Sequence, residues 1–241
     1  NALRIMLQGG SVNNWVYNTL NRKRNEDFML RKTFESEIQQ VKDDVLMLGS
    51  MVEQALVDAV ETLKKRDIKA AEKIFQEDRA INGKRFEIEN KLMVLIATQQ
   101  PMAHDLRLLA STMEIISELE RMGDYAKGIA NINIRMGDAA LLKPLIDIPR
   151  MAQKGADMLH RSLTAFVNED VEAAKKIPIE DDEVDALYNQ IYRELMMFII
   201  QDPKTIERAN WLLWVAHNLE RFADRVTNIC ERTVFIATGE M

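Results

Sequence analysis

The sequence has little of the residues that disulfide-rich or turn-rich folds require. A single Cys in 241 residues can form neither an internal disulfide nor a thiolate zinc site, which favours a reducing compartment. With only 9 Gly and 5 Pro, collagen, disordered chains and turn-rich β-sandwiches are poor fits. A net charge of −6 argues against a nucleic-acid binder, which needs a basic surface to neutralise phosphates. The 47% hydrophobic and 29% charged residues are typical of a folded protein.

Long apolar runs are also missing. The longest charge-free apolar stretches, 92–104 and 209–219, fall short of the roughly 18–20 apolar residues that a membrane span needs. The charge-free run 5–21 is interrupted by Gly and Asn and lacks the continuous apolar core of a signal peptide. The sequence therefore predicts a cytoplasmic protein.

Residues 1–28 read differently from the rest. They show no apolar stripe and carry Arg22, Lys23 and Arg24, and a new start is plausible at Met29. We expect an N-terminal extension, non-native or disordered; the alternative is a basic arm that touches an acidic membrane surface or a partner. This segment does not enter the fold prediction.

From residue 33 onward, helical periodicity dominates. Apolar residues recur every three or four positions through Val45, Leu48, Val52 and Leu56, which predicts a long amphipathic helix. Asp67 is expected to end it and cap a second helix, and Pro101 suits the first turn of a third that stops near Gly137. After a connector at 138–148, helices are predicted over 151–167, over 170–200 with a break at Pro178, and from Pro203 to about 237.

An internal repeat is the most informative global feature. Residues 67–74 match 170–177 at an offset of 103, and Glu77-Asp78 matches Glu180-Asp181 at the same offset. Residues 119–121 and 124 match 219–221 and 224 at an offset of 100. The sequence thus predicts an all-α fold, a tandem repeat of two three-helix bundles over 29–140 and 141–241.

The sharpest constellation is duplicated with the repeat. Glu120 and Asp124 lie four residues apart on the third helix, and Glu220, Asp224 and Asn228 follow the same spacing on the sixth. Residues four apart share one slanting stripe of a helix, here at the border of the apolar seam. The carboxylates are therefore expected to be partly shielded from solvent.

Two interpretations of this stripe stay open. Carboxylate and amide oxygens are the ligands that Mg²⁺, Mn²⁺ and iron prefer, so the pattern predicts a metal site on Glu120, Asp124, Glu220, Asp224 and Asn228. In the first repeat, Gly128 occupies the position that corresponds to Asn228 in the second, which leaves the first set one ligand short. The alternative is a solvated acidic face paired with Arg121 and Arg221.

Other candidates for chemistry are weaker. The three His are scattered and form no Glu-x-x-His pair, which counts against a ferritin-like di-iron enzyme. His217 could hydrogen-bond to Glu220, and Cys230 falls on the apolar side of the last helix as a core residue. No phosphate loop or nucleophile elbow is present, and no catalytic residue is predicted.

The duplicated Glu-x-x-x-Asp helices, the repeated Asp-x-x-Ala-Ala-x-x-Ile segment and the stretch 143–152 together resemble the PhoU family over about residues 29–240. The resemblance implies two three-helix bundles joined end to end with pseudo-two-fold symmetry. It also implies a cytoplasmic, often dimeric repressor of the phosphate-starvation response. Such a protein would bridge the phosphate transporter ATPase subunit and a membrane sensor histidine kinase, and iron, zinc, manganese or magnesium would bind on the acidic motifs.

The leading hypothesis is therefore a non-enzymatic negative regulator of phosphate uptake that binds metal and docks on these partners. A carboxylate-metal enzyme and a purely structural helical adaptor are the alternatives.

Overall fold

The computed structural model describes the backbone of residues 2–240 and the side chains of residues 20 and 31–240. It is built of helices, and no strand occurs over residues 2–240. The chain divides into two units, residues 1–42 and residues 43–241. The first unit is the N-terminal part of helix α1 (Ala2–Lys65). Residues 2–28 of the expected extension belong to this helix. Residue 20 is the one position among them whose side chain is described, so the role of the extension stays a prediction.

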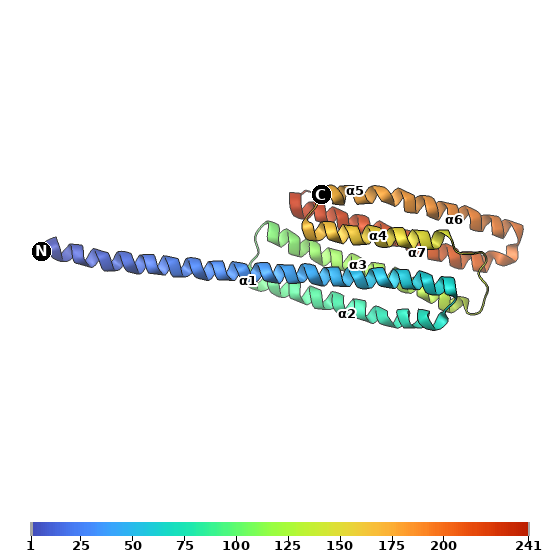
Figure 1. Cartoon of the computed structure of the whole chain (residues 1–241), viewed down its shortest axis with the longest axis horizontal. Coiled ribbons are helices and arrows are strands. Elements are labelled where there is room, and N and C mark those ends of the chain that lie inside the picture. The colour runs from blue at the N-terminus through green and yellow to red at the C-terminus, as the bar shows by residue number, and fades with distance from the viewer. Residues whose placement is uncertain (1, 241) are drawn as a thin grey trace. The chain divides into compact units, whose positions relative to one another are not determined.

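The second unit contains both repeats (Figure 1). The first repeat consists of the rest of α1, α2 (Ile68–Gln99) and α3 (His104–Met136). The second consists of α4 (Asp147–Asn168), α5 (Val171–Lys176), the 3₁₀ turn η1 (Ile177–Glu180), α6 (Asp181–Gln201), the 3₁₀ turn η2 (Pro203–Thr205) and α7 (Ile206–Thr238). The predicted all-α fold of two three-helix bundles is confirmed, since the interruption at Pro178 only divides the middle helix of the second repeat.

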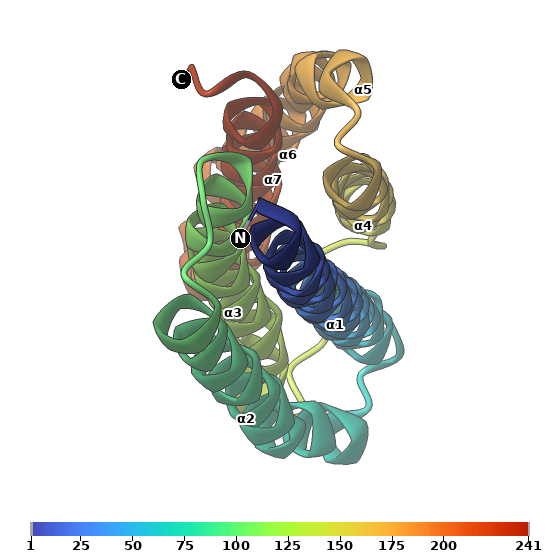
Figure 2. The same ribbon diagram turned by 90° about the vertical axis from the view of Figure 1, so that its left-hand side faces the viewer.

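The two bundles lie side by side, not end to end as the resemblance implied. Helices α3 and α7 make an extensive contact, and the end-on view shows them adjacent (Figure 2). On the other side, α1 approaches α4 closely: a Cβ at Gly49 would lie 2.0 Å from Leu163 Cδ1. The repeats therefore share one core along their length.

The apolar stripes predicted from the sequence form this core. Val45, Leu48, Val52 and Leu56 of α1 are fully buried, as are Ile116 and Leu119 of α3. One boundary prediction is wrong: Pro101 lies in the loop before α3, because Gln100 and Ala103 adopt positive φ angles that a helix cannot accommodate. Helix α4 begins at Asp147, earlier than predicted. Among the described residues, no helix is both long and apolar enough to span a bilayer.

The repeat also appears in how its helices begin. The Asp67 carboxylate accepts from Ala70 N at 3.0 Å, and the Asp170 carboxylate accepts from Ala173 N at 3.0 Å. In each case the preceding residue, Arg66 or Glu169, is in the left-handed region and reverses the chain. The predicted cap at Asp67 is thus confirmed, together with its counterpart.

We expect Asp67→Ala and Asp170→Ala each to lower the free energy of unfolding by about 1 kcal/mol, because each leaves an N-terminal N–H group without its acceptor. Urea unfolding followed by circular dichroism measures the loss. Asp67→Asn keeps a capping oxygen and should stay close to wild type. A loss in the Asn variant equal to that of the Ala variant would contradict the capping role.

Cys230 is a core residue, as predicted, with 1% of its surface exposed. Burial raises the pKa of its thiol to about 12. Because the thiolate is the reactive form, Ellman's reagent should leave the native protein unmodified at pH 8 and should titrate one thiol per chain in denaturant. Stoichiometric reaction of the native protein would show that the last helix opens readily.

Candidate functional site

The predicted acidic stripes lie on α3 and α7, beside the buried residues of each apolar seam. Glu220 and Asp224 are partly shielded, with 23% and 32% of their side chains exposed. Glu120 is also half-buried, whereas the Asp124 side chain is 53% exposed. The expected shielding therefore holds for three of the four carboxylates.

Helix α6 adds two carboxylates that the sequence did not assign to the site. Asp181 and Asp185 are four residues apart on α6, which packs against α7. For Asp181, the sequence signal is the repeated dipeptide, Glu77-Asp78 and Glu180-Asp181. We call Asp181, Asp185, Glu220 and Asp224 the second-repeat cluster.

The second-repeat cluster concentrates negative charge. Burial, followed by the charges of Asp224, Asp185 and Glu220, raises the pKa of Asp181 to about 6. Burial and neighbouring carboxylates also raise the pKa of Asp185 and of Glu220. Such shifts are typical of carboxylates held together without a neutralising cation.

Only the edge of the second-repeat cluster meets basic groups. Arg221 NH1 donates to Asp224 Oδ2 at 2.8 Å. His217 Nδ1 lies 3.3 Å from Glu220 Oε2, but that buried oxygen accepts no hydrogen bond, so the hydrogen bond considered from the sequence is not formed. Within the described residues, no basic side chain forms an ion pair with Asp181 or Asp185.

The first repeat has a corresponding set, with a cation built into it. Asp78 of α2 is 6% exposed, and its Oδ2 accepts from Lys127 Nζ at 2.8 Å and from Asn82 Nδ2 at 3.0 Å. Lys127 Nζ also lies 3.7 Å from Asp124 Oδ1. We call Asp78, Glu120, Asp124 and Lys127 the first-repeat cluster.

The third position of each motif faces the other repeat. Asn228 Nδ2 donates to Glu118 Oε2 of α3 at 3.1 Å. Gly128 in turn packs against α7, where a Cβ would lie 3.3 Å from Asn218 Nδ2. In the described part of the chain, Asn228 makes no hydrogen bond to the second-repeat cluster. Its contacts place it in the interface between the repeats, and its role as a ligand stays a prediction.

The donor chemistry of the second-repeat cluster fits a hard cation, because it offers carboxylate oxygens and one buried oxygen without a hydrogen bond. Among the residues with described side chains, no three His, Cys, Asp or Glu groups stand close enough to enclose an ion as they are. A bound ion must therefore draw the carboxylates inward. The first-repeat cluster does not fit a metal ion, since Lys127 already pairs with its buried carboxylate.

Comparison with known proteins identifies the architecture. The PhoU domain model matches residues 45–132 and again 148–233, once in each repeat. The PhoU homolog of Clostridium acetobutylicum, named a phosphate-specific transport system accessory protein, is 38% identical over 213 residues, covering 88% of this chain and 97% of its own. The Escherichia coli accessory protein PhoU is 32% identical, with 86% of each chain covered.

Solved structures agree. The crystal structure of the phosphate transport system regulatory protein PhoU from Streptococcus pneumoniae has a TM-score of 0.79 at 32% identity, covering 86% of this chain and 98% of its own. PhoU from Pseudomonas aeruginosa has a TM-score of 0.81 at 29% identity, covering 86% of this chain and all of its own. With both repeats matched by the domain model and relatives above 30% identity aligned over most of their length, this chain belongs to the PhoU family.

Proposed function

We propose that this chain is a cytoplasmic negative regulator of phosphate uptake and of the phosphate-starvation response. The observation that carries the proposal is the match of both repeats to the PhoU domain, together with relatives that are named accessory proteins of phosphate-specific transport. These relatives span nearly the same length as residues 29–241, so the comparison concerns the whole two-repeat body.

The proposed action is docking and not turnover. The relatives carry the names of accessory and regulatory proteins. The docking partners of this chain would be the transporter ATPase subunit and a membrane sensor histidine kinase. The chain would act as a homodimer. The outer side of α7 offers a surface for such contacts: Trp214 is 67% exposed and lies one turn before His217 and the acidic stripe. An exposed Trp beside charged groups is a common anchor of protein interfaces.

We also propose that the second-repeat cluster binds a divalent or iron-type metal ion. Asp181 and Asp185 would hold it from α6, and Glu220 and Asp224 from α7. The supporting observations are the carboxylate donor set and the buried Glu220 oxygen that accepts no hydrogen bond. Burial, and after it the neighbouring carboxylates, raise the pKa of Asp181, Asp185 and Glu220. A bound cation would supply charge neutralisation, and the chain's own residues would then present a less negative face to a partner.

Complementation tests the regulatory proposal. A strain of Escherichia coli that lacks its own PhoU relative should express phosphate-scavenging genes in phosphate-rich medium, and this chain should restore repression. Gene expression is read from an alkaline phosphatase reporter. A folded chain that leaves the reporter fully induced, and whose deletion in its own organism leaves repression intact, would overturn the regulatory proposal and leave the enzyme or adaptor alternatives.

A further inference from the structure

We propose that Lys127 is an internal cation that takes the place of a metal ion in the first repeat, so that the chain holds one metal centre, in the second repeat. This inference rests on the metal binding proposed above. It concerns the two clusters as a pair and the side chains that distinguish them.

The contacts of Lys127 carry the argument. Its ammonium group bonds to the buried Asp78 at 2.8 Å, lies 3.7 Å from Asp124, and stands 5.4 Å from the centre of the Phe75 ring. Only 30% of the Lys127 side chain is exposed. The ammonium is thus enclosed by two carboxylates and an aromatic face, as a bound cation would be.

The ammonium of Lys127 contacts both Asp78 and Asp124, the carboxylates that would have to hold a metal ion in this cluster. A divalent ion that entered this cluster would therefore meet a fixed positive charge a few ångströms away, in a site partly screened from water.

Several residues around the two clusters differ in charge between equivalent positions of the repeats. The counterpart of Lys127 is Thr227, and along the facing helices Arg79, Asn82 and Arg85 correspond to Asp182, Asp185 and Tyr188. These four exchanges make the surroundings of the second-repeat cluster more negative, whereas the exchange of Tyr125 for Arg225 has the opposite sign. The second-repeat cluster consequently has four carboxylates and no lysine, whereas the first-repeat cluster has three carboxylates and Lys127.

This asymmetry has a different cause from the one that the sequence suggested. From the sequence, the first repeat is expected to bind metal more weakly because Gly128 lacks the amide group that Asn228 has at the equivalent position. In the structure both of these positions face the opposite repeat, and Asn228 bonds to Glu118. The group that separates the clusters is therefore the ammonium of Lys127, outside the motif positions.

Removing Lys127 leaves space for an ion and its water ligands. A cavity of about 430 Å³ lies between α1, α2 and α3, and Asp78 and Lys127 are on its wall. Its other lining residues include Asp58 and Glu77, which supply further carboxylates. A variant without the lysine would thus retain donors and room for a hydrated cation.

Exchanging the residues of the two repeats tests the inference. Metal-free wild-type protein titrated with MnCl₂ should show a single class of binding sites, the one in the second repeat. Calorimetry measures the binding, and elemental analysis after gel filtration measures the metal content. Lys127→Thr should acquire a second class of sites, with first-repeat affinity at least about a hundredfold above that in wild type. Thr227→Lys should lose the original sites to a similar degree, and Lys64→Thr, at an exposed position on α1, should behave as wild type.

The results distinguish a failure of this inference from a failure of the metal binding on which it rests. Lys127→Gln is a second, milder variant if Lys127→Thr is unfolded by circular dichroism, and it should also gain sites. Wild type that fills both repeats equally, or folded Lys127 variants that gain no site while the second repeat binds, would overturn the inference alone. No Mn²⁺ bound by wild type, by Lys127→Thr or by Lys127→Gln would overturn the metal binding on which it rests.

Discussion

Asp181→Asn combined with Asp224→Asn will lower the affinity of this chain for Mn²⁺ by at least about a hundredfold. Each substitution exchanges a charged oxygen ligand for a neutral amide, and even the loss of groups that only support metal ligands costs about 10–100-fold. Asp181 lies on α6 and Asp224 on α7, so the pair removes one ligand from each side of the second-repeat cluster. Calorimetric titration with MnCl₂ measures the change.

Two matched variants accompany this experiment. Asp124→Asn is the counterpart of Asp224→Asn, and it should leave the Mn²⁺ affinity unchanged because Lys127 already occupies the first-repeat cluster as its cation. Glu231→Gln removes an exposed carboxylate from α7 away from the cluster and should also have no effect. A double variant that stays helical and binds Mn²⁺ like wild type would refute the site.

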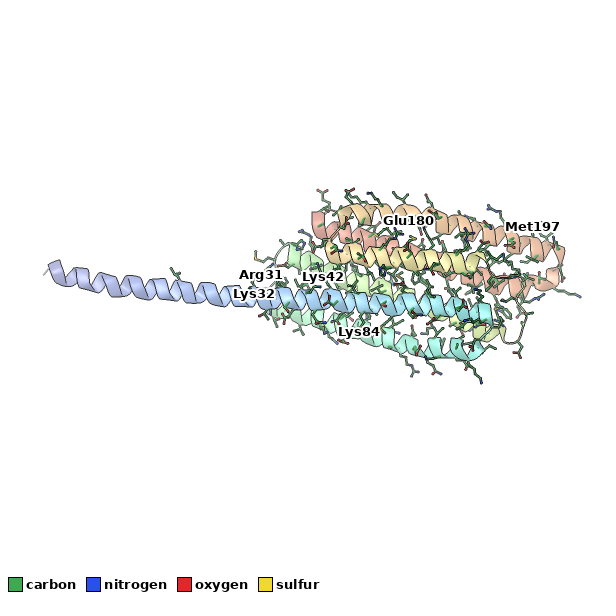
Figure 3. The ribbon with its side chains drawn as sticks, in the orientation of Figure 1. Arg31, Lys32, Lys42, Lys84, Glu180 and Met197 are labelled. Atoms are coloured by element: carbon green, nitrogen blue, oxygen red, sulfur yellow. The ribbon has the colours of Figure 1, made fainter. Side chains whose placement is uncertain are left out.

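Asp44→Asn will lower the free energy of unfolding by about 3 kcal/mol. The Asp44 side chain is only 6% exposed, and its two oxygens accept from Lys84 Nζ at 2.8 Å and from Lys91 Nζ at 2.6 Å. Lys84 is itself 13% exposed, so removing the carboxylate leaves a largely buried ammonium with the exposed Glu87 as its remaining partner. These contacts join α1 to α2, where Lys84 points towards α1 (Figure 3).

The contribution of Asp44 should also depend on pH. Burial raises the pKa of this carboxyl, but the combined effect of Lys84 and Lys91, which lowers it, is larger. The pKa of Asp44 therefore lies below its ordinary value of 3.8. The stabilisation is therefore present above about pH 4 and is lost as the pH falls below that value. The difference between wild type and Asp44→Asn should be largest at neutral pH and shrink towards pH 2.

Urea unfolding at pH 7, 4 and 3 tests both statements. Asp58→Asn, at an exposed position on the same helix, is the matched control and should change stability by less than about 0.5 kcal/mol. An Asp44 variant as stable as wild type at pH 7, or a difference that grows as the pH falls, would contradict the ion-pair account.

Local sequence patterns were sufficient to predict the helices and their repetition. Residues such as Leu48 and Leu119 fix the buried face of each helix, because the period of an α-helix relates positions along one chain. Asp67 indicates a helix start because its side chain can accept a hydrogen bond from a backbone N–H group of the first turn. Pro178 indicates an interruption because it has no backbone N–H group to donate. These are local relations, so sequence was sufficient for them and for the family.

Which helix faces contact one another became known only from the packed structure. Nothing in the periodicity of α7 indicates that Asn228 faces Glu118, or that Asp181 of α6 lies beside Glu220 and Asp224, because helix rotation and crossing are set by how side chains interlock across the core. The same holds for the contact of Lys127 with Asp78, which are 49 residues apart in the chain. The acidic motifs were thus visible in the sequence, whereas the cation that distinguishes one repeat from the other was recognised only once α2 and α3 were packed together.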